Sequence, residues 1–313
     1  MSESLFVGID VAKGSLAVAS SPAGLTLEIP NSPQGRSDLV KALKSHTIAL
    51  VVLEATGGYE RPVAAELLEA GFATVVVNPR QVRDFARGLG ELAKTDPIDA
   101  KVLARFAQIV QPKPRPAASA EQVELAELVG RRRQLVTTLA QESNRAEMAR
   151  LPRVRRSINA VRHMLDKQVE QLDEEIAKLI EADETLSRKD KILRSTPGVG
   201  PGTSAMLLSH LPEIGQLNRQ EVAALVGVAP WDIKSGRWTG QSSIWGGRAD
   251  VRGMLYMAAL TARRVNPTIV AFAKRLEAQG KAFKIVITAC MRKLLIILNS
   301  MLRSETLWRQ KNS

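Results

Sequence analysis

Three kinds of residue are scarce in this sequence of 313 residues, which has one cysteine, three histidines and only 4% aromatic residues. The single cysteine, Cys290, excludes an internal disulfide and a cysteine-based zinc site, and it fits a reducing compartment such as the cytosol. The histidines, His46, His163 and His210, are too widely spaced to suggest a multi-histidine metal site. No uninterrupted apolar run approaches the ~18 residues of a membrane span, and residues 1–10 are too short and too acidic for a signal peptide. We therefore expect a cytoplasmic protein without a membrane segment.

Acidic residues are scarce in only one part of the sequence. The whole chain has 44 Lys and Arg residues against 32 Asp and Glu residues, a formal net charge of +12. Residues 1–115 have a net charge of +1 and residues 116–190 a net charge of −1, whereas residues 191–313 hold 18 basic and 6 acidic residues, a net charge of +12. A concentrated basic excess is typical of proteins that bind polyanions, so we expect residues 191–313 to contact nucleic acid.

The first third of the sequence alternates short apolar runs with helix-forming segments, a pattern typical of an α/β domain. Strands are predicted where turn residues bound the apolar runs, at 5–9, 16–20, 25–29, 48–53 and 73–77. Helices are predicted at 34–45, at 61–70 and from Pro79 onward. Residues 111–116 contain three prolines, which lack the N–H groups that a helix needs, so we expect a linker there.

The rest of the sequence is predicted to be mostly helical. Residues 120–180 are nearly free of glycine, and Pro152 interrupts them near the centre, so two long helices are expected. Apolar residues in the second helix recur every three or four positions, as in a coiled coil: Val161, Leu165, Val169, Leu172, Ile176 and Leu179. This stripe is compatible with a helical hairpin within one chain or with a dimerisation arm. Further helices are predicted near 251–264, 268–279 and 284–303.

Four acidic residues lie where strands end or a helix begins. Asp10 and Glu54 each directly follow a predicted strand, whereas Asp96 and Asp99 lie at the start of a helix, three residues apart on one face. Four neighbouring carboxylates stay ionised only with counter-charge, and oxygen-only ligands suit Mg²⁺ or Mn²⁺. Two such ions could stabilise both the attacking and the leaving oxygen at a phosphodiester.

Each carboxylate also has a simpler interpretation. Asp96 could be a helix N-cap, with Asp99 interacting favourably with the helix dipole. Asp10 could be a turn residue. The segment 8–13 also has the form of the hairpin with which actin-like sugar kinases contact ATP phosphates, although no second phosphate loop follows.

Eight motifs in order along the chain carry a resemblance to a known family. They are at 8–13 (GIDVAK), 53–57 (LEATG), 77–79 (VNP), 94–100 (KTDPIDA), 192–200 (ILRSTPGVG), 225–230 (LVGVAP), 234–236 (KSG) and 252–257 (RGMLYM). In this order they resemble the DEDD transposases of the insertion sequence 110 family, which also includes the Piv-type DNA invertases. The resemblance covers nearly the whole chain.

The resemblance implies a fold and a division into domains. Residues 1–116 would form a RuvC-like domain of ribonuclease H-like fold, residues 117–190 a helical coiled-coil region for oligomerisation, and residues 191–313 a basic, helical transposase domain. The expected fold class is therefore α/β plus all-α. Asp10, Glu54, Asp96 and Asp99 match the metal-binding DEDD tetrad of the family residue by residue, which implies Mg²⁺ or Mn²⁺ as the cofactor.

The resemblance also implies a serine nucleophile at Ser235. From the residues alone, a Ser-Gly pair in a loop is usually a turn, and Ser242 and Ser243 are rival candidates. A serine hydroxyl needs activation by a base or a metal ion before it attacks a phosphate. A phosphoserine link would keep the phosphodiester bond energy, so DNA strands could be exchanged and rejoined without ATP.

Several residues near this serine are candidates for nucleic-acid contacts. Arg237, Arg248 and Arg252 could hold phosphate oxygens. Gly198 and Gly200 lie in a glycine-rich turn that resembles the hairpin of a helix-hairpin-helix element, where backbone N–H groups contact phosphates without reading the sequence. A plain turn between two helices remains the alternative.

We therefore expect an RNA-guided DNA transposase or recombinase that acts as a homodimer or homotetramer in the bacterial cytoplasm, at the nucleoid when active. Its expected partners, by resemblance, are double-stranded donor and target DNA and a structured guide (bridge) RNA. One alternative is a RuvC-like nuclease or Holliday-junction resolvase that hydrolyses DNA with water. Another is a nucleic-acid-binding protein without catalytic activity.

Overall fold

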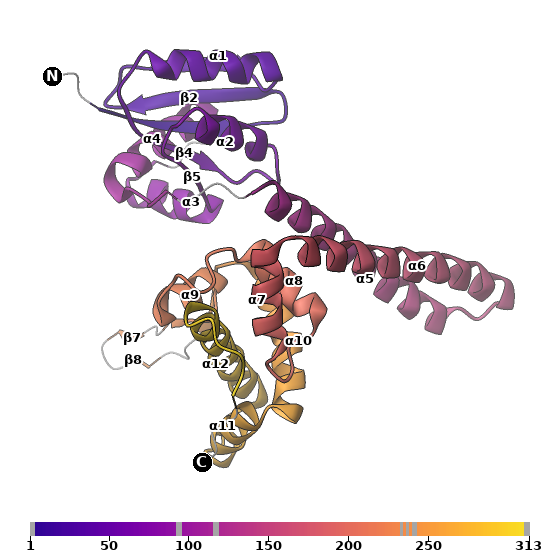
Figure 1. The fold of residues 1–313 in the computed structure, drawn as a ribbon. Helices are drawn as coiled ribbons and strands as arrows, with labels where there is room; N and C mark the ends of the chain where they lie inside the picture. Colours follow the sequence, from indigo (N-terminus) through magenta and orange to yellow (C-terminus); the bar gives the residue numbers. More distant parts are fainter. Residues whose placement is uncertain are drawn as a thin grey trace. The chain divides into compact units, whose positions relative to one another are not determined.

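The computed structural model describes residues 4–91, 96–114, 119–231, 234–235, 238–239 and 243–309 of the chain. The chain divides into two compact units, Met1–Ala117 and Ala118–Ser313 (Figure 1). The first unit is an α/β domain and the second is almost entirely helical, so the expected combination of α/β and all-α parts is confirmed.

A mixed sheet of five strands forms the centre of the first unit. The strands are β1 (Leu5–Val11), β2 (Ser15–Ser21), β3 (Thr26–Pro30), β4 (Ile48–Glu54) and β5 (Thr74–Val77), in the order β3-β2-β1-β4-β5. β1, β2 and β3 pair antiparallel, whereas β4 and β5 continue the sheet parallel to β1. All five strands lie where the apolar runs of the sequence predict them.

Helices cover both faces of this sheet. Alternate residues of β1, such as Val7 and Ile9, pack with α1 (Pro33–Lys44) and α2 (Glu60–Glu69) in one apolar cluster. The opposite face packs against α3 (Pro79–Gly88) and α4 (Asp96–Val110). Because side chains alternate between the faces of a strand, Gly8 and Asp10 belong to the α4 side.

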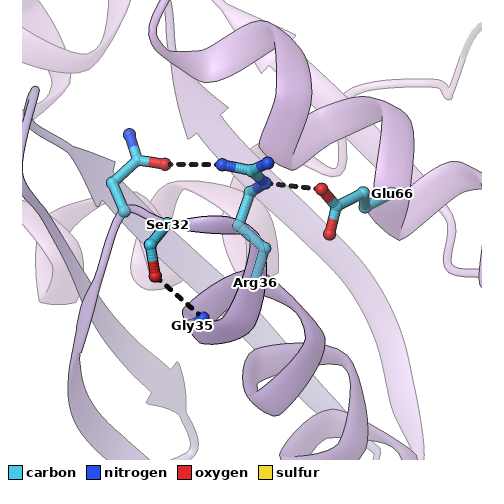
Figure 2. A network of polar contacts seen from close by, with 5 residues as sticks. Ser32, Gly35, Arg36 and Glu66 are labelled. Atoms are coloured by element: carbon cyan, nitrogen blue, oxygen red, sulfur yellow. Dashed lines mark hydrogen bonds and ion pairs between the residues drawn. The ribbon is translucent and has the colours of Figure 1, made fainter.

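A short polar network fixes the start of α1 and joins it to α2 (Figure 2). The Ser32 hydroxyl caps α1 by accepting a hydrogen bond from the Gly35 N–H at 3.1 Å. Arg36 Nε donates to Glu66 Oε1 of α2 at 2.5 Å. Both helices are thereby held on the same face of the sheet, and the opposite face is left to α3 and α4.

Two long helices open the second unit. α5 (Ala120–Met148) and α6 (Pro152–Ala182) lie side by side as a hairpin (Figure 1), and an ion pair between Arg132 and Asp173 joins them. The predicted interruption at Pro152 is confirmed, and the proline occupies the first turn of α6, where its missing N–H costs nothing. Leu165 and Ile176 of the predicted stripe are buried. The hairpin within one chain is therefore present, and the dimerisation arm stays a prediction.

The remaining helices of the second unit pack around one core. They are α7 (Glu184–Arg194), α8 (Pro201–His210), α9 (Arg219–Val226), α10 (Ala249–Val265), α11 (Pro267–Ala278) and α12 (Phe283–Arg303). Four two-residue strands lie between α9 and α10: β6 (Pro230–Trp231), β7 (Lys234–Ser235), β8 (Trp238–Thr239) and β9 (Ser243–Ile244). The helices expected near 251–264, 268–279 and 284–303 are all present.

α12 is the central helix of this core. Within the described chain it is the one helix long and apolar enough to cross a membrane, with a mean hydropathy of 1.8 over an 18-residue window. However, 56% of that window is buried in the second unit, and α12 contributes core residues such as Cys290, Leu294 and Leu298. The apolar character of α12 is thus explained by core packing, and no membrane protein is indicated.

Candidate active site

Asp10 and Glu54 lie side by side at one edge of the sheet. Ile9 and Leu53 are partners in the parallel pairing of β1 with β4, so the next residues along the two strands are Asp10 and Glu54. Neighbouring strands are about 4.8 Å apart. Both carboxylates are half-buried, and both belong to the face of the sheet that α3 and α4 cover. Two acidic side chains from distant parts of the sequence thus share one sheet edge.

A close packing contact brings the start of α4 to the same edge. Gly8, two residues before Asp10, lies so close to α4 that a Cβ atom there would overlap the carbonyl oxygen of Ala100. Asp99, the neighbour of Ala100 in the first turn of α4, is half-buried. Because residue 8 is glycine, α4 can pack directly against β1, and this packing places Asp99 near the same sheet edge. Asp96 begins α4, and its side chain lies outside the described part of the structure.

The loop that follows Glu54 is fixed by a residue that the sequence analysis did not single out. Glu60 is only 7% exposed, and its Oε2 accepts hydrogen bonds from the N–H of Thr56 at 3.0 Å, from the Thr56 hydroxyl at 3.2 Å and from the N–H of Gly58 at 2.8 Å. Burial by itself raises the pKa of Glu60, but these hydrogen bonds outweigh it, so the pKa lies below its ordinary value. The sequence signal was an acidic residue just after the Gly57-Gly58 turn.

The donor chemistry of this edge suits a divalent cation. Asp10, Glu54 and Asp99 offer only carboxylate oxygens, the ligand type that Mg²⁺ and Mn²⁺ prefer. Among the side chains that the structure describes, no three His, Cys, Asp or Glu groups are close enough together to hold one ion. The fourth residue of the expected set, Asp96, is outside that search. Asp10, Glu54 and Asp99 therefore suit a divalent cation by ligand type and by their common sheet edge, but the three described side chains do not by themselves form a metal site.

Ser235 lies in a short hairpin of the second unit. Its backbone is part of β7, and Ser235 pairs with Trp238 of β8. The two strands pair antiparallel. The Ser235 side chain and the whole of Arg237 lie outside the described residues, as does the rival Ser242.

Arg248 and Arg252 have protein partners. Arg248 Nη1 and Nη2 donate to Glu213 Oε2 and Oε1 at 2.7 and 2.6 Å, and Nη1 also donates to the carbonyl oxygen of His210 at 2.7 Å. Arg252 donates to the carbonyl oxygens of Gly246 and Val226. Both guanidinium groups thereby hold the segment before α10 against α8 and α9. Their contact with a phosphate stays a prediction.

The two glycines of the turn between α7 and α8 differ in their surroundings. Gly198 has φ +97°, and a Cβ atom there would lie 2.6 Å from the Cα of Ala262 in α10, so only glycine fits. Gly200 is the N-cap residue of α8, and a Cβ atom there would meet nothing within 4 Å. Close packing thus explains why residue 198 is glycine, but it does not explain the glycine at position 200.

Two family models match the chain, one before α6 and one after it. A model for DEDD transposases of IS110 type, described as "Transposase", matches residues 7–149, and one described as "Transposase IS116/IS110/IS902 family" matches residues 190–274. The chain belongs to the IS110 family of transposases. The pilin gene-inverting proteins of Moraxella bovis and Moraxella lacunata are each 29% identical to it in an alignment of 311 positions that covers 96% of each chain.

Family membership identifies an enzyme that rearranges DNA and therefore has DNA as its substrate. The first family match includes Asp10, Glu54 and Asp99, and the second includes Ser235 and the Gly198 turn. The two sets of candidate residues thus fall in the two matched parts of an IS110-family transposase. Residues 275–313, which include α12, lie beyond both matches.

Proposed function

We propose that this IS110-family transposase cleaves and exchanges DNA strands through a covalent phosphoserine at Ser235, with a metal-bound Asp10, Glu54, Asp96 and Asp99 tetrad. The observation that carries the proposal is the placement of Asp10 and Glu54 at the ends of adjacent parallel strands, beside the first turn of α4 with Asp99. The strand order β3-β2-β1-β4-β5 with helices on both faces supports a RuvC-like fold for the first unit.

In the proposed first step, the Ser235 oxygen attacks the phosphorus of a DNA phosphodiester. A bond forms between the serine oxygen and phosphorus, and the bond from phosphorus to one sugar oxygen breaks. The serine loses its proton, and the released sugar oxygen gains one. The sugar hydroxyl of a second strand then attacks the phosphoserine, which restores the serine and joins the strands. Mg²⁺ or Mn²⁺ held by the four carboxylates would supply positive charge that stabilises the developing negative charge.

The remaining parts of the chain have proposed roles in holding the substrates. The turn that contains Gly198 and Gly200, between α7 and α8, would act as a helix-hairpin-helix element whose backbone N–H groups contact phosphates. The hairpin of α5 and α6 would join copies of the chain into a dimer or tetramer in the cytoplasm. The net charge of +12 in residues 191–313 supports binding of donor DNA, target DNA and a guide RNA.

A denaturing gel tests the chemistry. The protein is incubated with labelled DNA, with Mg²⁺ or with a chelator, and the expected product is a protein–DNA adduct that needs the metal. Ser235→Ala should abolish the adduct, whereas Ser243→Ala should retain it. Free nicked DNA that Ser235→Ala leaves unchanged would instead identify a hydrolytic nuclease. A chain that binds DNA but neither cleaves it nor forms an adduct would have no catalytic function.

The RNA guide is tested separately. RNA that co-purifies with the protein is sequenced, and its pairing with the donor and target DNA is altered by substitution. The choice of DNA should follow the altered pairing. If no RNA co-purifies and added RNA leaves the choice of DNA unchanged, RNA guidance is wrong while the serine chemistry can still stand.

A further inference from the structure

The positive charge of the second unit is concentrated at one end. The segment from Arg263 to Lys293 contains eight basic residues and one acidic residue, a net charge of +7 out of the +12 of the whole chain. The basic residues are Arg263, Arg264, Lys274, Arg275, Lys281, Lys284, Arg292 and Lys293. Seven of them belong to the end of α10, to α11 and to the first half of α12, and Lys281 lies in the segment between α11 and α12. These helices pack together at one end of the unit (Figure 1). We call this surface the basic face.

Two phenylalanine rings hold part of the basic face together. The Arg263 guanidinium lies 5.3 Å from the ring centroid of Phe283. Arg275 and Lys293 lie 5.2 and 4.3 Å from the centroid of Phe272. Cations at these distances are attracted to the ring, so Phe283 holds a charge from α10 and Phe272 holds charges from α11 and α12. Burial and the nearby positive charge of Arg275 lower the pKa of Lys293, which agrees with crowding of like charges.

The outer cations of the basic face lack acidic partners. Glu277, the single acidic residue of the segment, pairs with Arg263. In the described part of the chain no carboxylate pairs with Arg264, Lys274, Lys281 or Lys284, all of which are exposed. Like charges held together without counter-charge repel one another, and a bound polyanion relieves this repulsion. Arg248, which the sequence motifs favoured, is by contrast neutralised by Glu213.

We propose that the basic face binds the phosphates of a double-stranded nucleic acid without reading its sequence. The Phe272 ring is contacted by two cations, whereas single-strand sites commonly use aromatic rings to stack with bases. Rows of exposed Lys and Arg side chains suit the phosphate backbone of a duplex. This inference rests on the proposed function, because it supplies a grip on DNA or on a helical part of RNA. Much of the face, including α12, lies beyond residue 274, where the second family match ends.

The test compares two variants that each lose four positive charges. The test variant carries Arg264→Gln, Lys274→Gln, Lys281→Gln and Lys284→Gln. The control variant carries Lys167→Gln, Lys178→Gln, Lys191→Gln and Arg219→Gln, all exposed positions of the same unit. Binding to a 30-base-pair DNA duplex and to an RNA duplex of random sequence is followed by fluorescence anisotropy over a range of salt concentrations. Circular dichroism melting establishes that both variants are folded.

The test variant should lose tenfold or more in affinity at about 0.1 M salt. On DNA the magnitude of its slope of log K against log salt should fall by about 3.6, because each of the four lost phosphate contacts removes about 0.9. The control variant should bind nearly as the original chain does. A loss of affinity for both duplexes would identify general binding to helical nucleic acid. A loss of affinity for one duplex would identify that nucleic acid as the partner. Equal losses in the two variants, or no loss in either, would overturn the proposal. So would a loss of binding to anionic lipid vesicles without any loss on the duplexes.

The outcome is separable from that of the proposed function. At saturating protein concentration the test variant should still form the adduct at Ser235, since none of its substitutions touches the tetrad or the serine. Absence of any adduct in the original chain, together with weakened duplex binding in the test variant, would count against the serine chemistry alone. Normal adduct formation with unchanged duplex binding in the test variant would count against the basic face alone.

Discussion

Arg248, the N-cap residue of α10, and Glu213, in the segment after α8, form a two-pronged ion pair with N–O distances of 2.6 and 2.7 Å. Both side chains are largely buried, so the pair is better shielded from solvent than a surface salt bridge. The pair fixes the segment before α10 in place. It also gives a structural reason for an arginine that the sequence analysis assigned to phosphate binding.

Removal of either partner of this pair should destabilise the second unit. We expect Arg248→Ala and Glu213→Ala each to lower the free energy of unfolding by about 1–3 kcal/mol, because a partly buried charge is left without its partner. Urea unfolding measures this effect. If Arg248→Ala unfolds normally but loses DNA binding, while Glu213→Ala keeps both properties, the arginine holds a phosphate instead.

Gly8→Ala should displace α4 and with it Asp99. The added methyl group would overlap backbone atoms of α4, and overpacking of this kind typically costs about 1–3 kcal/mol. Both the midpoint of thermal unfolding and Mn²⁺ binding, followed by electron paramagnetic resonance, should fall. Gly14→Ala in the turn between β1 and β2 is the matched control, because a Cβ atom there would meet nothing within 4 Å. Equal behaviour of the two variants would contradict the close packing at Gly8.

Ionisation of Glu60 should make the free energy of unfolding depend on pH. Its pKa is lower in the folded state than its ordinary value of 4.5, so its stabilising effect is complete above that value and disappears as the pH falls through the folded pKa. Glu60→Gln should therefore cost about 1–3 kcal/mol at pH 7, and the cost should shrink below about pH 4. Glu69→Gln, at an exposed position of the same helix, should cost little at any pH. A pH-independent difference between Glu60→Gln and the original chain would show that ionisation of Glu60 is not involved.

Alanine substitutions of the two glycines in the α7–α8 turn should distinguish a role in packing from a role in nucleic-acid binding. Gly198→Ala meets both a positive φ and the backbone of Ala262, so we expect a loss of at least 1 kcal/mol in stability. Gly200→Ala has space for its methyl group and should fold normally. A duplex-binding defect in Gly200→Ala would support a phosphate contact at the start of α8. Normal binding in this stable variant would argue that the turn has only a structural role.

Cys290 should be unreactive in the folded chain. The thiol is fully buried in the core around α12, and burial raises its pKa, so very little thiolate forms at neutral pH. Labelling by a thiol reagent should proceed only as fast as the second unit unfolds. Rapid labelling under native conditions would mean that the core around α12 opens locally.

The sequence was sufficient to predict the strands and helices, but not the contacts between residues that lie far apart in the chain. The five strands and the helix boundary at Pro152 were predictable because apolar runs, turn residues and proline act locally. The shared edge of Asp10 and Glu54 followed from their positions after predicted strands, once those strands pair. The partner of Arg248 was not predictable, since Glu213 is 35 residues away and two helices must pack before they meet. Glu60 was missed for a similar reason, because its role depends on the shape that the loop takes around it.

The basic face shows the same limit in another form. Its net charge could be counted along the sequence, but the rings that gather the charges could not be identified from it. Phe272 and Lys293 are neighbours only because α11 packs against α12. Local composition therefore indicated the kind of partner, and tertiary packing indicated the surface.

The position of α12 in the chain has a consequence for synthesis on the ribosome. Every element of the sheet and its covering helices in the first unit has been made once residue 110 emerges, whereas the core of the second unit lacks its central helix until residues 283–303 emerge. Because domains generally fold as units during synthesis, the first unit, with Asp10 and Glu54 at its sheet edge, can fold well before the second unit, which contains Ser235. Ribosome stalling within α12 should therefore leave a chain whose first unit resists proteolysis and whose second unit is digested.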